Sequence, residues 1–262
     1  MLRSELNNFL SNISGTQSVY YQLATYLNNH KKHYLPTLKE SFMGSTLIMG
    51  DLTGPSDNGW KLNYPTGFSN SIKLPEMPSN IDTLISREGM RNVATAYEIL
   101  ESFLYDVTAA FLTLNPDLRG HAKKIENPTD VDLKEQIRLY RGRNNKELFK
   151  LIRTISPTFK TSEVQNTPDI NLKEWYVTLS HARHAIVHSL FKLDLTKVKL
   201  TKYQRQVLDH YFSYELHDDI AELTLSYEQA NRTIIMIAEF GFLIFKSFSI
   251  EMNEDWRVFR DK

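Results

Sequence analysis

The sequence predicts a mainly α-helical protein: an antiparallel helical bundle with an N-terminal helical arm, a long irregular loop and one small β-hairpin. Three observations lead to this fold class. Apolar residues recur at helical spacing through most of the chain after Ser86. Glycine and proline are concentrated between residues 44 and 82, where they interrupt regular structure. Two short segments near residue 218 have the composition of paired strands.

Composition sets the class of protein before any motif is considered. The chain has 262 residues, 41% hydrophobic and 24% charged, and 31 Lys and Arg balance 31 Asp and Glu. Such a chain buries a core without disulfides or a structural metal. The absence of cysteine excludes a disulfide framework, a thiolate metal site and a cysteine nucleophile. The N-terminus is too polar for a signal peptide, so we expect a soluble, cytoplasmic protein without a membrane segment.

The N-terminal third predicts an arm and a loop. We expect a short helix at Leu2–Leu10 and a longer one at Ser18–Tyr34. The segment 44–82 holds five of the ten glycines and four of the nine prolines, which predicts a long irregular connection. That connection either covers a site or partner surface or is a poorly structured linker. We therefore expect residues 1–82 to form the arm and loop, residues 83–252 the bundle, and residues 253–262 a tail.

The bundle helices follow from apolar periodicity. One seam three heptads long predicts a helix over 86–115. A second helical region covers 132–155, broken near 142–145, and a third covers 172–191. The first seam comprises Val93, Tyr97, Leu100, Leu104, Val107, Phe111 and Leu114. The buried side of the third helix comprises Leu172, Trp175, Leu179, Ala182 and Ile186.

The pattern changes near the C-terminus. The segments 211–216 and 221–225 predict a small hairpin. Ser226 followed by Gln229 has the form of a capping box and predicts the start of a last helix. The most apolar stretch, Ile234–Phe245, lies in that helix and is about a dozen residues long, whereas a membrane-spanning helix needs about 20. We therefore expect a core helix.

Basic residues are concentrated in one segment of the chain. Between residues 136 and 160 there are seven Lys and Arg and a single acid, Glu147. A strip of this kind either contacts RNA phosphates or forms a solvated helix face balanced by the acidic C-terminal part. The candidate RNA-binding residues within it are Arg138, Arg141, Arg143, Lys146 and Lys150.

Three histidines share one stripe of the third helix. His181, His184 and His188 lie opposite its apolar side, with Arg183 among them. One interpretation is a zinc site, which lacks a nearby carboxylate ligand and any HExxH motif. A second is an exposed polar helix face. A third is a phosphate site, in which arginine binds a phosphate and histidine transfers a proton.

The segment from Arg183 to His188 favours the third interpretation. Arg183, a polar His184, three apolar residues and His188 resemble the Arg-x4-6-His motif of HEPN domains. A long helix containing Tyr97–Leu104, which precedes the motif helix by about 80 residues, and a final apolar helix also resemble this family. The resemblance covers residues 83–252.

The resemblance implies a metal-independent endoribonuclease without a cofactor, of the kind found in toxin–antitoxin, abortive-infection and antiviral defence systems. The ribose 2′-OH attacks the adjacent phosphate and leaves a cyclic phosphate and a 5′-OH. His188 would be general base or acid, Arg183 would stabilise phosphate charge, and His184 would orient the site or contact phosphate. The alternative is a HEPN-like module that binds RNA, nucleotide or protein without cleavage. An antitoxin or defence-system protein is a possible partner, although Leu190 replaces the tyrosine that some antitoxins modify.

Helix geometry adds an expectation about assembly. Five residues along a straight helix separate Arg183 and His188 by about 140°. Either the helix is disturbed or a second chain completes the site. HEPN nucleases resemble the latter case, so we expect a homodimer with the site at its two-fold interface. Glu98, Glu101 and Asp106 are either partners of Arg183 from the neighbouring helix or exposed or capping acids.

Overall fold

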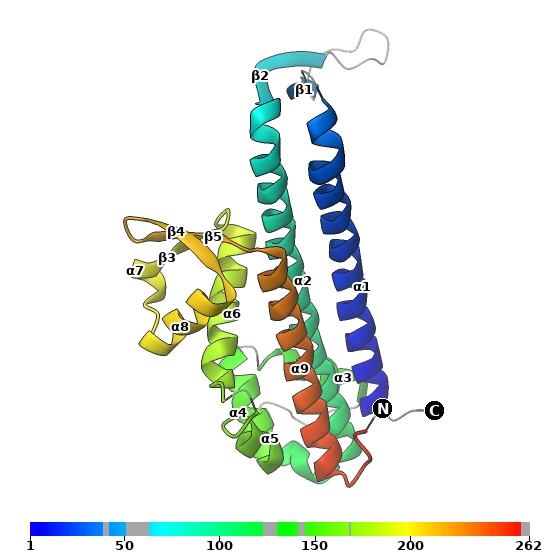
Figure 1. Cartoon of the computed structure of the whole chain (residues 1–262). Helices are drawn as coiled ribbons and strands as arrows, with labels where there is room; N and C mark the ends of the chain where they lie inside the picture. Colours follow the sequence, from blue (N-terminus) through cyan, green and yellow to red (C-terminus); the bar gives the residue numbers. More distant parts are fainter. Residues whose placement is uncertain (39–41, 51–62, 123–129, 141–144, 168, 258–262) are drawn as a thin grey trace. The chain divides into compact units, whose positions relative to one another are not determined.

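The computed structural model describes residues 1–38, 42–50, 63–122, 130–140, 145–167 and 169–257. This part of the chain is mainly helical, with a two-stranded and a three-stranded antiparallel sheet (Figure 1). The α-helices are α1 (Leu2–Asn29), α2 (Met77–Leu114), α3 (Asp130–Arg138), α4 (Lys146–Ile155), α5 (Pro157–Ser162), α6 (Leu172–His188), α7 (Leu195–Val198), α8 (Lys202–Tyr211) and α9 (Tyr227–Glu251). The strands are β1 (Phe42–Gly50), β2 (Asn63–Lys73), β3 (Lys192–Asp194), β4 (Ser213–His217) and β5 (Ile220–Thr224). Short helices of other types are η1 (His30–Tyr34), η2 (Leu35–Thr37), η3 (Leu74–Glu76) and η4 (Pro116–His121).

The chain divides into two compact units. Residues 1–21 and 86–262 form the first unit, and residues 22–85 form the second. The segment 1–82, which we expected to lie outside the bundle, is therefore shared between the two units. The helices α1 and α2 both run across the boundary, and each unit is described by itself below.

The first turns of α1 are part of the first unit because they carry a continuous apolar face. Leu2, Leu6, Phe9 and Ile13 recur at helical spacing, and all four are buried. Phe9 stacks on Phe103 of α2, with ring centroids 4.4 Å apart. The two helices expected at Leu2–Leu10 and Ser18–Tyr34 are instead joined in the single helix α1. The residues between them include Gly15 but no proline, and a glycine costs only about 1 kcal/mol in a helix.

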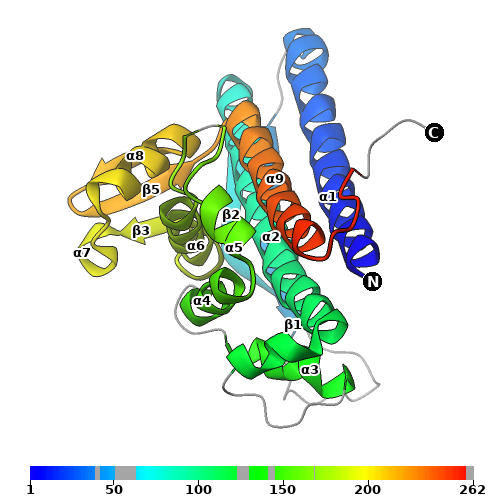
Figure 2. The same cartoon turned by 90° about the horizontal axis from the view of Figure 1, so that it is seen from below.

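The helices α2, α6 and α9 form the core of the first unit and run side by side (Figure 2). The predicted seam of α2 is confirmed: six of its seven members are buried, and only Leu114, the last residue of the helix, is exposed. Phe111 stacks on Phe248 of α9 at 4.2 Å. Trp175 of α6 meets Phe240 of α9 edge-on at 5.5 Å. Aromatic packing of this kind adds about 1 kcal/mol per pair beyond area burial.

The last helix, α9, begins as predicted. Ser226 and Gln229 form the capping box, in which each side chain accepts a hydrogen bond from the other's backbone N–H. By length and composition alone α9 is able to cross a membrane, but 61% of its most apolar window is buried inside the protein. A core helix of a soluble protein has the same properties.

The predicted C-terminal hairpin is also present, as β4 and β5 joined in antiparallel register. The strand β3 pairs with the other edge of β5, with Leu193 opposite Ala221, and gives the order β3-β5-β4. The sequence pattern did not predict β3, because three residues are too few to show an alternation of apolar and polar side chains. This strand places the chain that follows α6 beside the hairpin.

The second unit corrects the expectation of an irregular connection over residues 44–82. Its described part contains the antiparallel pair β1–β2, and α2 begins at Met77. Proline is compatible with both elements: Pro65 lies in an edge strand at a register shift, and Pro78 lies in the first turn of a helix.

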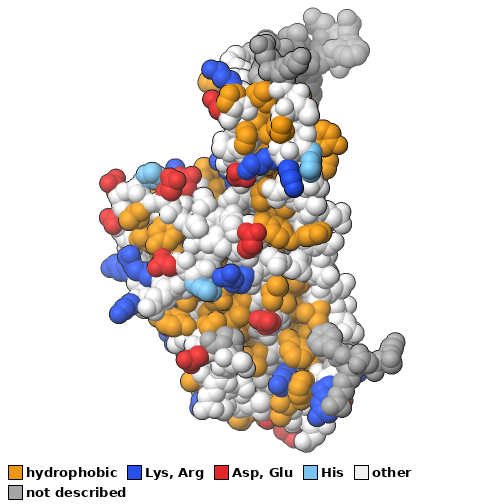
Figure 3. Space-filling model, in the orientation of Figure 1, with side chains coloured by type: hydrophobic (Ala, Val, Ile, Leu, Met, Phe, Trp, Pro, Cys, Tyr) orange, Lys and Arg blue, Asp and Glu red, His pale blue; other side chains and the backbone are white. Residues whose placement is uncertain are grey.

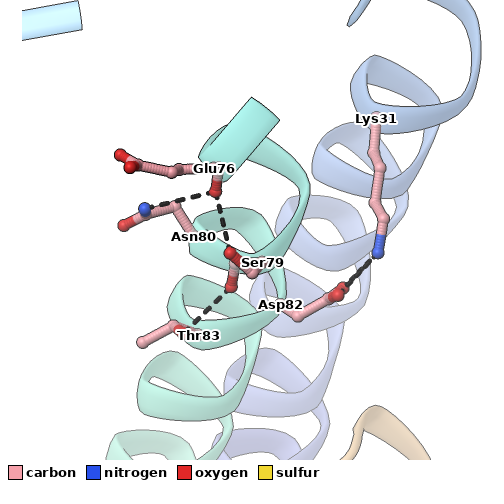
Figure 4. A network of polar contacts seen from close by, with 6 residues as sticks. All are labelled: Lys31, Glu76, Ser79, Asn80, Asp82 and Thr83. Atoms are coloured by element: carbon pink, nitrogen blue, oxygen red, sulfur yellow. Dashed lines mark hydrogen bonds and ion pairs between the residues drawn. The ribbon is translucent and has the colours of Figure 1, made fainter. Parts of the chain in front are cut away.

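Polar contacts order the start of α2 (Figure 4). The backbone carbonyl of Glu76 accepts hydrogen bonds from Ser79 Oγ (2.9 Å) and Asn80 Nδ2 (3.3 Å). Lys31 Nζ lies 2.6 Å from a carboxylate oxygen of Asp82, so an ion pair joins η1 to α2 within the second unit. These local bonds extend α2 nine residues before the predicted start at Ser86.

Candidate functional site

The helix α6 positions the predicted catalytic residues. Asn171 caps its start by accepting the N–H of Glu174 (3.1 Å), and the five residues predicted for its buried side are all buried. The helix stays regular up to His188 and ends there. Leu190 and Phe191 then take left-handed conformations (φ 51° and 69°) that turn the chain into β3.

Arg183 is tied to the neighbouring helix. Its Nη2 donates to Glu98 Oε1 at 2.6 Å, so Glu98 is the acid that pairs with it. The Nε of Arg183 is buried and has no hydrogen-bond partner in the described part of the chain. The Arg183 side chain is partly buried and Glu98 is half-exposed, so this ion pair holds the guanidinium at the surface of the helix pair.

His184 and His188 lie together on the exposed side of α6. Their ring centroids are 4.9 Å apart, and both residues are exposed. Because the helix is regular, the side chains of Arg183 and His188 point about 140° apart. The alternative of a disturbed helix, which would aim both at one phosphate within a single chain, is therefore wrong.

A pocket of about 560 Å³ opens beside Arg183. His181, Arg183 and His184 of α6 line one side, and Lys192 and Lys197 line another. His188 is absent from the lining. The pocket thus brings together two of the three predicted catalytic residues, Arg183 and His184, with two lysines that were not among the predicted site residues. Both lysines follow the Arg183–His188 motif within ten residues. This short distance in the sequence could have identified them as candidate site residues.

The lysine side of the pocket is held by a local cap. Asp194 accepts hydrogen bonds from the Thr196 hydroxyl (2.6 Å) and the Lys197 backbone N–H (3.2 Å), and its other carboxylate oxygen lies 3.0 Å from Lys197 Nζ. These bonds hold the pKa of Asp194 well below its usual range, because they stabilise the ionised form. The carboxylate keeps Lys197 close to the pocket.

The floor of the pocket is a buried polar network around Asn145. Asn145 is 2% exposed and left-handed (φ 52°), and its Oδ1 accepts from the Tyr105 hydroxyl at 2.6 Å. Its Nδ2 donates to Glu101 Oε1 at 2.6 Å and to the Tyr176 hydroxyl at 2.7 Å. Burial raises the pKa of the nearby Tyr97, which also lines the pocket, to about 12. The phenol therefore stays neutral at physiological pH.

The three described residues of the predicted RNA-binding strip do not line this pocket. Arg138, Lys146 and Lys150 are exposed, and Lys150 is paired with Glu147 at 2.8 Å. Arg141 and Arg143 lie outside the described residues. Over the side of the first unit that carries β3–β5, acidic and basic side chains are interspersed on the face shown in Figure 3.

Among the residues that the structure describes, no group of three His, Asp or Glu side chains is arranged to hold a metal ion. His181, His184 and His188 lie on one helix, and they form no such group within the described ranges. No family model, no curated protein and no solved structure matches the chain. The function is therefore inferred from the site itself.

Proposed function

We propose that this protein is a metal-independent endoribonuclease of HEPN type. One observation carries the proposal: Arg183 and His184 of the Arg-x4-His segment line a pocket with two lysines, and the ring of His188, outside the lining, lies 4.9 Å from the ring of His184. Arginine, lysine and histidine together provide phosphate binding and proton transfer, which cleavage of RNA without a metal requires.

In this proposal the substrate's ribose 2′-OH attacks the adjacent phosphorus, and His188 accepts its proton as general base. The bond from phosphorus to the 5′-oxygen of the next nucleotide breaks. A second histidine of the site, protonated at the start of the reaction, supplies a proton to that oxygen. The products are a 2′,3′-cyclic phosphate and a 5′-OH. Arg183 stabilises the charge on the phosphate oxygens, and His184 contacts phosphate or orients the site.

The divergence of Arg183 and His188 on a regular helix supports a site completed by a second copy. In a two-fold dimer each α6 meets its own copy, so Arg183 of one subunit is able to face His188 of the other. Mixed dimers test this arrangement. A dimer of one Arg183→Ala chain and one His188→Ala chain regains one intact site if the two residues act across the interface. It stays inactive if both must come from one chain.

The first test is cleavage of a single-stranded RNA by the purified protein in EDTA. Wild type is expected to cut, and His188→Ala and Arg183→Ala to lose about 10²-fold or more in rate. His217→Ala is the matched control, because His217 is an exposed histidine on β4 in the same unit. Abolition of cutting by EDTA, or equal cutting by His188→Ala, would refute the proposal.

A module that binds RNA, nucleotide or protein without cleavage is the second candidate. The pairing of Arg183 with Glu98 favours it, since this ion pair occupies part of the guanidinium that catalysis would need. Binding without cutting by a folded dimer would support this candidate. A toxin or defence role in the cytoplasm, with a partner that restrains the protein, is also a proposal. Growth inhibition on expression, relieved by His188→Ala, tests that role.

A further inference from the structure

Among the described residues of the pocket lining, Glu101 is the acid that is held by a buried side chain. Its Oε1 accepts from Asn145 Nδ2 at 2.6 Å, and Asn145 is itself fixed by the hydroxyls of Tyr105 and Tyr176. The Oε2 of Glu101 accepts no hydrogen bond within the described part of the chain. The carboxylate is therefore oriented, half-buried and able to accept hydrogen bonds in the pocket.

Glu101 serves neither as the ion-pair partner of Arg183 nor as a ligand in a described metal cluster. Glu101 does not pair with Arg183, because Glu98 takes that position. It is not part of a described metal cluster either. One oxygen of this carboxylate is bound by Asn145, and the side chain also lines the pocket, where it is able to accept further hydrogen bonds.

The chemistry of the pocket then selects a ligand. An ionised carboxylate is an acceptor only, so it binds groups that present N–H donors. Guanine presents two adjacent donors, N1–H and the 2-amino group, on its Watson–Crick edge. Adenine and cytosine present only an amino group beside an acceptor, and uracil presents one N–H between two carbonyls. Proteins read single-stranded RNA through this same edge.

We propose that the pocket is a guanine-recognition site in which Glu101 accepts hydrogen bonds from guanine N1–H and the 2-amino group. Asn145 is its positioning residue. The pocket volume of about 560 Å³ falls within the usual range for small-ligand pockets, about 300–1,000 Å³. Arg183 and His184 line the same pocket, so the recognised guanosine would lie next to the cleaved phosphate. This placement rests on the proposed ribonuclease function, but base recognition by itself does not.

The test uses wild-type protein and short uridine-rich RNAs that carry one variable base. We expect cleavage beside guanine to be about tenfold or more faster than beside adenine, cytosine or uracil. Replacement of guanine by hypoxanthine removes only the 2-amino group, and replacement by 2-aminopurine removes the N1–H together with the 6-oxygen. Each replacement is expected to lower the rate about tenfold. These substrates test the contact without any change in the protein.

The matching variant is Glu101→Gln. Asn145 would hold the amide oxygen, and the amide nitrogen would present a donor to guanine. Cleavage beside guanine should therefore slow to the rate seen beside the other bases, a preference of about onefold. Glu215→Gln, an exposed acid on β4 in the same unit, is the control and should keep the preference. Circular dichroism confirms that both variants fold. If Glu101→Gln does not fold, the modified bases still decide the question.

Binding of guanosine 5′-monophosphate, compared with inosine and adenosine 5′-monophosphates, separates the two proposals. Cutting without base preference would overturn guanine recognition and leave the nuclease intact. Selective guanosine monophosphate binding by a protein that cuts no RNA would support guanine recognition and refute the nuclease. Equal binding of the three nucleotides without cutting would refute both.

Discussion

Replacement of Asn145 gives the sharpest test of the pocket floor. Asn145→Ala removes hydrogen bonds to two tyrosine hydroxyls and to the Glu101 carboxylate. A buried neutral hydrogen bond contributes about 1 kcal/mol, and one to a charged group about 2 kcal/mol. The left-handed backbone (φ 52°) adds about 1 kcal/mol of strain for alanine. We therefore expect a loss of about 4–5 kcal/mol in the free energy of unfolding.

Asn145→Gly separates the two contributions. Glycine also removes the side chain, but it adopts the left-handed conformation without steric cost. It should therefore be more stable than Asn145→Ala by about 1 kcal/mol while both lose the hydrogen bonds. Urea unfolding followed by circular dichroism at 222 nm measures the three proteins. A loss below about 1 kcal/mol in Asn145→Ala would refute the assignment of a fixed polar network. A glycine variant less stable than the alanine variant would refute the strain assigned to the left-handed backbone.

Three further predictions concern the fold. Gly241→Ala should destabilise the protein by about 1–3 kcal/mol in thermal unfolding, since an added Cβ would overlap the ring of Phe9. Glu163→Ala should cost about 2–3 kcal/mol in urea unfolding. In the wild-type protein Arg153 donates two hydrogen bonds of 2.6 Å to the Glu163 carboxylate, and the substitution leaves Arg153 without this partner. Because the folded pKa of Tyr97, about 12, lies above the unfolded value of 10, stability should be full below pH 10. It should fall as pH rises towards 12, and Tyr97→Phe should make that fall shallower in alkaline unfolding.

Each of these expectations has an outcome that contradicts it. An unchanged unfolding temperature in Gly241→Ala would mean that Phe9 of α1 does not pack closely against Gly241 of α9. An unchanged midpoint in Glu163→Ala would show that the bidentate pair contributes no more than a surface ion pair, about 0–1 kcal/mol. Identical alkaline unfolding of wild type and Tyr97→Phe would show that this phenol titrates as it does in the unfolded chain.

Local patterns in the sequence were sufficient for much of the fold. The helical seam before residue 115, the buried side of α6, the β4–β5 hairpin and the capping box of α9 are all confirmed. Each depends on neighbours within a few residues: apolar spacing, turn residues or a reciprocal cap. Such signals are present before the chain folds, and burial in the core follows their periodicity.

Other features depended on residues far apart in the chain. The β1–β2 pair lies where glycine and proline predicted irregular structure, and three-residue β3 exists only because β5 offers an edge. The first turns of α1 join the bundle through Phe9 and Phe103, which are 94 positions apart. These pairings are decided by long-range contacts, which local composition does not encode.

The candidate site shows the same division. The sequence by itself determined which residues are the candidates for the proposed chemistry, because Arg183, His184 and His188 stand within six positions on one helix. Only the tertiary structure decided that Glu98 rather than Glu101 pairs with Arg183, that Lys192 and Lys197 face the pocket, and that His188 lies outside it. It also placed Asn145 against Glu101 from a segment 44 residues away. The physical reason is that helical periodicity fixes the side of one helix on which a residue lies, whereas the packing of several helices fixes its partners.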